Sequence, residues 1–409
     1  MTNKYKYTYG TLANGLRIVH CQNRGNVEYC GLAIQVGSRN ETPRTYGLAH
    51  FVEHSIFKGT KRRHSWHIIN RMESIGGELN AYTSEETTML YSVFPKGGLT
   101  RAVELMHDLV ANSEFPERQI EREREVVLDE IASYLDSPSE AVFDSFNDLM
   151  FSGSSLGHNI LGNTETIPTF TSQICRQFLE RYYTPKNMVF FYLGPSSAER
   201  VASVVGKFFE KLDRPTIKHT LQPPAILEPF DKYNHIGSHQ CHTLMGARIP
   251  GMFANEKHTF ALLNNIIGGP CMNSLLNIEL RERHGYVYSV DSSTSLFSDC
   301  GELTVYFGCD PEHTAPCRKI VTEIFNRLAS KQMSERALNA AKKQYLGQMA
   351  VASENNEQAA LAAGRSTLFK GFVTPVHEII EHIRSVSTDD IRNAAEGIAK
   401  QGLSVLTFG

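Results

Sequence analysis

The residues with the clearest capacity for chemistry are two histidines and a glutamate within five positions: His50, Glu53 and His54. In a helix, the four-residue spacing places both imidazoles on one face, and no flanking proline interrupts the helical pattern. Neutral imidazole is a common zinc ligand, and a carboxylate beside it can take a proton from a zinc-bound water molecule. The motif therefore predicts a catalytic zinc site that needs a third protein ligand.

A second acidic segment offers candidates for the third ligand. Residues 121–131 combine good helix formers with an N-terminal run of acids, which favours a helix. Glu123 and Glu130 are seven residues apart, so two helical turns bring them to the same face. One can complete a His/His/Glu zinc site while the other holds a ligand histidine in place. The alternative is that both are solvated acids paired with Arg122 and Arg124.

Length and composition narrow the functional classes. A chain of 409 residues exceeds one typical core, so two domains are expected. A net charge of −3 gives no excess of basic residues of the kind that binds nucleic acid. No apolar run reaches membrane-spanning length. Residues 1–7 lack the apolar core of a signal peptide. The eight cysteines form no closely spaced metal-binding pairs and are typical of reduced thiols, which predicts a cytoplasmic protein.

An internal repeat organises the chain. The strand-like segments 188–194 and 403–408 each follow a helical segment, and 91–94 has a similar partner in 304–307. The offset between partners is roughly 210 to 217 residues, which indicates two copies of one α+β unit.

Prolines between the two copies mark a linker. They predict domains at 1–214 and 231–409, joined by a linker at 215–230. Each domain is expected to have an α+β fold in which helices cover one face of an antiparallel sheet. The expected strands are 16–21, 28–36, 79–84, 88–94 and 187–194 in the first domain, and 240–248, 287–297, 302–308 and 403–408 in the second.

The repeat predicts that one copy lacks the metal site. At the repeat offset, Phe260, Leu263 and Asn264 occupy the places of the two histidines and the glutamate. These side chains cannot bind zinc in the same manner. Catalysis is therefore expected in the first copy.

These features resemble the pitrilysin family of metallopeptidases, the inverted zincins with the H-x-x-E-H signature. The similarity is greatest to the branch of mitochondrial processing peptidase and the short bacterial peptidases. Further matching blocks follow in the family's order and span nearly the whole chain: 14–17, 76–83, 156–162 and 280–289. In the third block, His158 stands where the family commonly has arginine.

The resemblance implies a role for each motif residue. His50, His54 and Glu130 would bind one zinc ion per chain. Glu53 would be the general base that activates the zinc-bound water, and Glu123 would support a ligand from behind. The implied fold is the processing-peptidase type, with two homologous α+β domains of which one is active.

Two residues of the second copy match a family pattern for substrate contact. Arg281 and Tyr288 fit R-x-x-x-G-x-x-Y, which faces the zinc site in this family. Arginine can bind a substrate carbonyl, and the tyrosine hydroxyl can donate to an oxyanion. The alternative is a surface arginine and a half-buried strand tyrosine. Long relatives close two such units over the substrate, so the resemblance implies a homodimer in which one subunit's pair completes the other's site.

A strand after the Gly76-Gly77 turn is the candidate substrate platform. Asn80, Ala81 and Tyr82 belong to this strand, near the metal helix in sequence. An exposed edge there can take an extended peptide as an added strand, through main-chain hydrogen bonds. The alternative is an ordinary inner strand paired on both sides.

We therefore expect a cytoplasmic zinc-dependent endopeptidase that hydrolyses unfolded peptides inside a closed chamber, with no nucleic-acid or membrane partner. One alternative is a processing protease that removes a defined presequence, because its motif chemistry would be identical. An alternative from another class is a catalytically idle assembly or scaffold subunit, as occurs among relatives of the family. The complete set of metal-site residues argues against the idle subunit.

Overall fold

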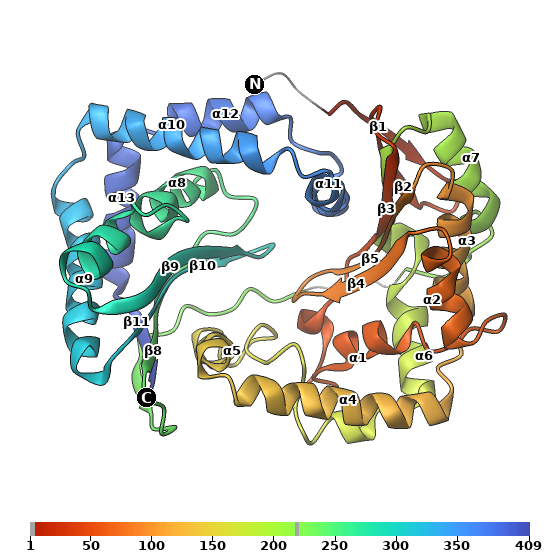
Figure 1. Ribbon diagram of the computed structural model, residues 1–409, viewed down its shortest axis with the longest axis horizontal. Helices are drawn as coiled ribbons and strands as arrows, with labels where there is room; N and C mark the ends of the chain where they lie inside the picture. Colours follow the sequence, from red (N-terminus) through yellow and green to blue (C-terminus); the bar gives the residue numbers. More distant parts are fainter. Residues whose placement is uncertain (1–4, 217–220) are drawn as a thin grey trace. The chain divides into compact units, whose positions relative to one another are not determined.

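The computed structural model describes residues 5–216 and 221–409 and divides into two compact units (Figure 1). Residues 1–4 and 217–220 lie outside the described part, and the second group falls within the predicted linker. Unit 1 contains the described residues of the ranges 1–132, 158–221 and 353–375. Unit 2 contains Ser133–Gly157, Gln222–Ala352 and Val376–Gly409.

Unit 1 has a six-stranded sheet in the order β1-β2-β6-β3-β5-β4. Its strands are β1 (Tyr7–Thr11), β2 (Arg17–Gln22), β3 (Val27–Ile34), β4 (Glu78–Thr83), β5 (Thr88–Pro95) and β6 (Met188–Gly194). All residues of β6 are buried, because this central strand is covered on both faces. The strand β4 lies at an edge and pairs with β5.

Helices cover both faces of this sheet (Figure 1). They are α1 (Leu48–Ser55), α2 (Ser65–Glu73), α3 (Leu99–Asn112), most of α4 (Glu117–Leu135), α6 (Ser172–Tyr182), α7 (Ala198–Phe209) and α11 (Asn356–Lys370). On one face, Val201, Val205 and Phe209 recur every four residues along α7 and form a buried stripe in the main core. On the other face, Leu361 of α11 packs in a second apolar cluster with Phe191.

Unit 2 repeats this plan with a five-stranded sheet in the order β7-β11-β8-β10-β9. Its strands are β7 (Asp231–Asn234), β8 (Cys241–Ile249), β9 (Val287–Leu296), β10 (Gly301–Cys309) and β11 (Ser404–Phe408). Its helices are α5 (Pro138–Met150), α8 (Lys257–Gly268), a π-helical turn (Asn277–Arg283), α9 (Thr314–Ser330), α10 (Glu335–Ala352), α12 (Val376–Ser385) and α13 (Thr388–Gln401).

Both faces of the second sheet are also covered. The helices α8, α9 and α13 pack in one core, while α5 covers the other face, where Val142 and Phe146 join Leu244 and Phe408. None of the helices in the described parts of the chain combines the length and apolar character that a membrane crossing requires.

The α+β class and the repeated plan are confirmed, with one difference in strand direction. The order β2-β6-β3-β5-β4 in unit 1 corresponds to β7-β11-β8-β10-β9 in unit 2. In each sheet, the first of these pairs is parallel and the rest are antiparallel. The sequence predicts a purely antiparallel sheet, which is wrong for one pair of strands in each unit. Strand direction depends on non-local pairing, which the pattern of side chains does not encode.

The compact units also differ from the predicted contiguous domains. The helix α5 lies within 1–214 in sequence but packs in unit 2, and α11 lies within 231–409 but packs in unit 1. Each sheet has a second apolar face that must be buried, and a helix from the other half of the chain buries it. The sequence predicts helices on one face alone, because local periodicity does not show which sheet a helix will cover.

Candidate metal centre

The metal helix α1 begins where two distant segments of unit 1 meet. Gly47, the residue before α1, has a left-handed backbone with φ of 91°, which glycine adopts without steric cost. A Cβ at this position would lie 2.6 Å from the carbonyl oxygen of Leu161 and 2.7 Å from Cα of Gly162. Leu161 and Gly162, at the end of the family-like block, therefore pack directly against the start of α1.

Three predicted ligands converge in unit 1. The rings of His50 and His54 are 4.4 Å apart between centroids on one face of α1. Oε2 of Glu130, on α4, lies 3.9 Å from Nε2 of His50 and 3.6 Å from Nε2 of His54. Among the residues that the structure describes, this trio forms the one cluster of metal-ligand type.

The donor set fits zinc. Two imidazole nitrogens and one carboxylate oxygen are a common set for catalytic zinc, which keeps its fourth position open. Oε2 of Glu130 is buried without a hydrogen-bond donor in the described structure, an unfavourable state that a bound cation would relieve. Burial, with a smaller effect of His54, lowers the pKa of His50 to about 3. The imidazole is therefore neutral, as a metal ligand must be.

The carboxylate of Glu123 holds the Nδ1 side of the His54 ring, and the ammonium group of Lys58 binds that carboxylate. Nδ1 of His54 lies 3.1 Å from Oε1 of Glu123, and Oε2 of Glu123 lies 2.7 Å from Nζ of Lys58. Burial raises the pKa of Glu123, but its bonds to His54 and Lys58 outweigh that effect and lower the pKa overall. An ionised Glu123 accepts a hydrogen bond from Nδ1–H of His54, and Nε2 of the same ring faces Glu130.

Glu53 lies on α1 beside the edge strand β4. Its Oε2 accepts a 3.3 Å hydrogen bond from the hydroxyl group of Thr83, the last residue of β4. Burial raises the pKa of Glu53, and Glu130 adds to the rise while His54 and Thr83 oppose it. The arrangement gives a proton acceptor with an orienting donor next to the metal-ligand cluster.

A buried pair fixes the start of α1. Glu41 accepts hydrogen bonds from the N–H groups of Gly47 (2.8 Å) and Ala49 (2.6 Å), and Nε2 of His158 lies 3.0 Å from it. The ring of His158 stacks on Tyr46 with centroids 3.8 Å apart. Burial raises the pKa of Glu41, and the three donors oppose the rise. The histidine that replaces the family's common arginine therefore faces the carboxylate that caps the metal helix.

The predicted substrate strand is the edge strand β4. Asn80, Ala81 and Tyr82 pair with β5 on one side, and β4 is the last strand of the sheet on the other. Tyr82 is exposed, and its two neighbours are partly exposed. The edge therefore presents backbone groups close to the metal helix, as addition of a peptide strand requires.

The structure places Arg281 and Tyr288 in unit 2, and both are exposed. Arg281 belongs to the π-helical turn before β9. Tyr288 is the second residue of β9, and its hydroxyl donates to the carboxylate of Asp310 at 3.2 Å. These residues do not form a metal cluster with other described side chains of unit 2.

The counterpart of the metal helix in unit 2 is apolar. Phe260 and Leu263 of α8 are buried, and the side-chain amide of Asn264 donates to the carbonyl oxygen of Ser292 at 3.1 Å. Phe260 and Leu263 therefore contribute to the core of unit 2. Among the residues described, the group of metal-ligand type lies in unit 1.

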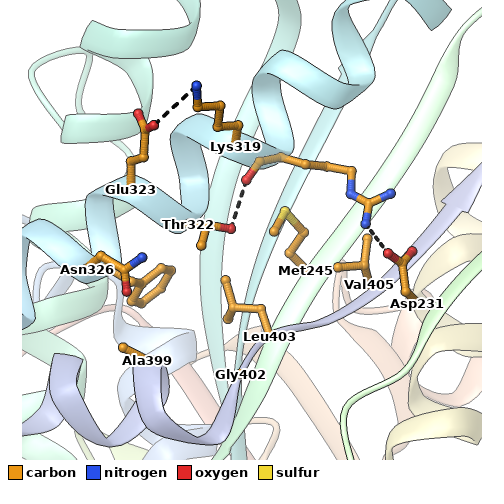
Figure 2. A pocket seen from close by; sticks show the side chains of 12 residues that line it. Asp231, Met245, Lys319, Thr322, Glu323, Asn326, Ala399, Gly402, Leu403 and Val405 are labelled. Carbon is orange, nitrogen blue, oxygen red and sulfur yellow. Dashed lines mark hydrogen bonds and ion pairs between the residues drawn. The ribbon is translucent and has the colours of Figure 1, made fainter.

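Unit 2 also contains a cavity of about 420 Å³, shown in Figure 2, which holds none of the predicted site residues. Met245, Leu403 and Val405 give it an apolar lining. Arg318 and Asp231 form an ion pair across its edge. The lining includes no cluster of metal-ligand type.

Three contacts around the site were not anticipated from the sequence. Lys58 follows His54 by four residues, so its position near the metal helix could have been inferred from spacing. Thr83 lay within the predicted strand, but its bond to Glu53 depends on how β4 packs against α1. Glu41 has no clear local signal, because its partners come from two segments, the start of α1 and the distant His158.

Family comparisons cover most of the chain. Residues 17–164 match the model described as insulinase (peptidase family M16), and residues 169–345 match the model described as the M16 peptidase inactive domain. The first match contains all of the metal-ligand cluster. The second contains the apolar counterpart helix α8.

Relatives match over nearly the full length. An uncharacterized zinc protease of Streptomyces coelicolor is 32% identical, covering 98% of this chain and 88% of the relative. One of Bacillus subtilis is 29% identical, covering 96% of this chain and 94% of the relative. The fold matches the crystal structure of a protease from Helicobacter pylori with a TM-score of 0.90 at 20% identity, covering 99% of each chain. It also matches a Pseudomonas fluorescens structure described as a peptidase M16 inactive domain, with a TM-score of 0.92 at 15% identity and coverage of 99% and 98%.

Proposed function

The chain belongs to the insulinase (M16) family of peptidases, and on that premise we propose that it is a zinc-dependent endopeptidase that hydrolyses unfolded peptides. The observation that carries the proposal is the convergence of His50, His54 and Glu130 beside Glu53. A metal site with a neighbouring carboxylate base is typical of a metallopeptidase active site. A cytoplasmic location is part of the proposal and rests on the sequence composition.

The three ligand side chains would hold the metal, each in a different way. His50 offers a neutral imidazole because burial disfavours its protonated form. His54 offers Nε2 because Glu123 binds its Nδ1 atom. Glu130 offers an oxygen that has no donor in the described structure. When bound, zinc supplies a Lewis acid that polarises the scissile carbonyl and makes water acidic enough to react near neutral pH.

Glu53 would move the proton. Its carboxylate takes a proton from the water molecule as the water oxygen bonds to the carbonyl carbon, and then passes that proton to the amide nitrogen as the C–N bond breaks. The hydroxyl of Thr83 orients the carboxylate through its bond to Oε2. Because burial raises the pKa of Glu53, the group holds this proton more firmly than an exposed glutamate would.

The peptide would bind along β4. An extended segment added at this edge exchanges main-chain hydrogen bonds with alternate residues of the stretch from Asn80 through Ala81 to Tyr82, largely irrespective of its sequence. Thr83, at the end of the same strand, contacts Glu53, so a peptide on β4 runs toward the base. This mode favours unfolded peptides, because a folded protein has few free extended backbone segments.

A second copy of the chain would complete the site. Arg281 and Tyr288 are exposed on unit 2 and carry groups suited to a substrate carbonyl and an oxyanion. The family resemblance favours a homodimer in which these residues act on the partner subunit's substrate. Peptides and a second copy are thus the proposed partners.

Cleavage of a mixed quenched-peptide library tests the proposal against its alternatives. We expect turnover that a chelator abolishes and added zinc restores, with products from many library members. Cleavage restricted to one presequence-like peptide class would favour a processing protease instead. Full zinc content without turnover would favour an idle subunit.

A further inference from the structure

A strongly basic cavity lies in unit 1, outside the metal centre. Its volume is about 800 Å³, and its walls come from the loop after α1 together with α2 and α3. Five of the lining side chains carry a permanent positive charge: Lys61, Arg62, Arg63, Arg71 and Arg101. None of them has a role in the proposed peptidase chemistry.

Two of these cations are held by carboxylates that do not themselves line the cavity. Arg63 binds Asp108 at 2.5 Å and Glu104 through two contacts of 2.7 and 2.9 Å. Arg71 shares Glu104 at 3.2 Å, and its Nε atom is buried without an acceptor in the described structure. These pairs hold two guanidinium groups in place at the cavity and leave a donor on Arg71 unused.

The other three cations lack comparable compensation. Arg101 bonds neutral oxygens, the carbonyl of Arg71 at 3.1 Å and the hydroxyl of Ser74 at 2.9 Å. Nε of the exposed Arg62 lies 4.0 Å from Asp108, which already binds Arg63. Lys61 is also exposed. The carboxylates near these five cations are Glu104, Asp108 and, on the cavity wall, Glu114. Five positive charges against three negative charges leave a surplus of two positive charges.

We propose that this cavity binds a multiply charged phosphate anion, such as an oligophosphate or the phosphate chain of a nucleotide. Guanidinium groups form paired hydrogen bonds with phosphate oxygens, and here they project from three different elements around one space. A compact anion fits within a cavity of this kind, whereas an extended acidic peptide would need a groove. The surplus positive charge is compensated by such a ligand.

The chain carries a natural reporter for this cavity. Trp66 is its single tryptophan, is 66% exposed, and packs edge-on against His67 with ring centroids 5.2 Å apart. His67 lines the cavity. A bound anion should therefore change the tryptophan fluorescence of the intact protein.

The test is a titration of the zinc-loaded protein with sodium tripolyphosphate, followed by Trp66 fluorescence and calorimetry. We expect saturable binding with a Kd below about 1 mM at low salt, weakening as salt is added. The double variant Arg62→Gln/Arg101→Gln should bind at least tenfold more weakly. A matched variant, Arg200→Gln/Lys207→Gln, removes two exposed charges of α7 and should change the Kd less than twofold.

The comparison of variants also controls for metal chelation. Tripolyphosphate can extract zinc, but both double variants keep the metal centre, so extraction would give equal signals in all three proteins. Equal signals, or no saturable binding by wild type, would overturn the proposal. A parallel titration with ATP identifies the source of the phosphate. Equal affinity means that the phosphate chain alone is bound, and tenfold tighter ATP binding means that the nucleoside also contributes; both support the anion site.

Discussion

Nζ of Lys58 lies 2.7 Å from Oε2 of Glu123, whose other carboxylate oxygen lies 3.1 Å from Nδ1 of His54. The ammonium group therefore acts on the metal centre through two intermediaries. It favours the ionised form of Glu123, which in turn fixes the orientation and tautomer of a ligand histidine. Such outer partners commonly change metal affinity by about 10- to 100-fold when they are removed.

Replacement of Lys58 by methionine should therefore weaken zinc binding by about tenfold. Methionine keeps the apolar stem but removes the charge that stabilises ionised Glu123. The measurement is zinc affinity by competition with a chromogenic chelator. Lys96→Met, which removes an exposed lysine of unit 1 elsewhere, should leave the affinity unchanged. Equal affinities in the two variants would show that Lys58 does not act on the ligand.

Replacement of Thr83 by valine should lower kcat about tenfold with unchanged zinc content. Valine has the same shape but cannot donate to Glu53, and a hydrogen bond to a charged group contributes about 1.5–3 kcal/mol. The measurements are steady-state kinetics and bound zinc. Thr45→Val, on the loop before α1, is the control. If kcat were unaffected, the bond would not orient the base.

The metal helix and its ligand pair could be predicted because their geometry is local. The four-residue spacing of His50 and His54 determines that they share a helical face. The choice between Glu123 and Glu130 could not be made from spacing, since both lie on one face of α4. The structure distinguishes them by packing: Glu130 approaches both Nε2 atoms, while Glu123 approaches Nδ1 of His54.

The missed parts of the fold are those without a local signal. The strands β1 and β7 are almost wholly exposed, so they lack the apolar residues that marked the other strands in the sequence. The exchange of α5 and α11 between the two halves depends on which sheet face remains uncovered. Periodicity shows that a helix is amphipathic and does not identify its partner.

The free energy of unfolding should depend strongly on the interaction between the buried residues Glu41 and His158. His158→Leu leaves a buried carboxylate without its partner and should lower the free energy of unfolding by about 3 kcal/mol. His158→Arg, which keeps a donor, should be much less destabilising. Urea denaturation measures both. The double variant Glu41→Gln/His158→Leu should recover part of the loss, and strict additivity would contradict direct coupling.

The effect of His158→Leu should also grow with pH. Burial raises the pKa of Glu41 in the folded protein above its unfolded value of about 4.3, and loss of His158 raises it further. A carboxyl with a raised folded pKa stabilises the fold at low pH, and this contribution is lost as pH rises from the unfolded value through the folded value. Denaturation at pH of about 4 and about 7 should therefore show the smaller difference from wild type at the lower pH. A pH-independent difference would exclude ionisation of Glu41 as its cause.

Mixing two inactive variants tests whether Tyr288 acts on the partner subunit. Glu53→Gln and Tyr288→Phe should each have low activity alone. If the subunits exchange at random, half of the dimers are mixed and each has one intact site, so about one quarter of wild-type activity should return. Absence of recovery, with subunit exchange shown by mass, would mean that Tyr288 does not act in trans.

The zinc-peptidase function is tested most sharply by comparing wild type with Glu53→Gln, assaying bound zinc and cleavage of quenched peptides on the same samples. We expect one zinc per chain in both proteins and turnover by wild type alone. A glutamine amide in place of the Glu53 carboxylate cannot accept the proton, while the ligands His50, His54 and Glu130 are unchanged. Equal turnover by the two proteins would contradict the role of Glu53. Absence of zinc from wild type, purified without chelator, would contradict the metal centre itself.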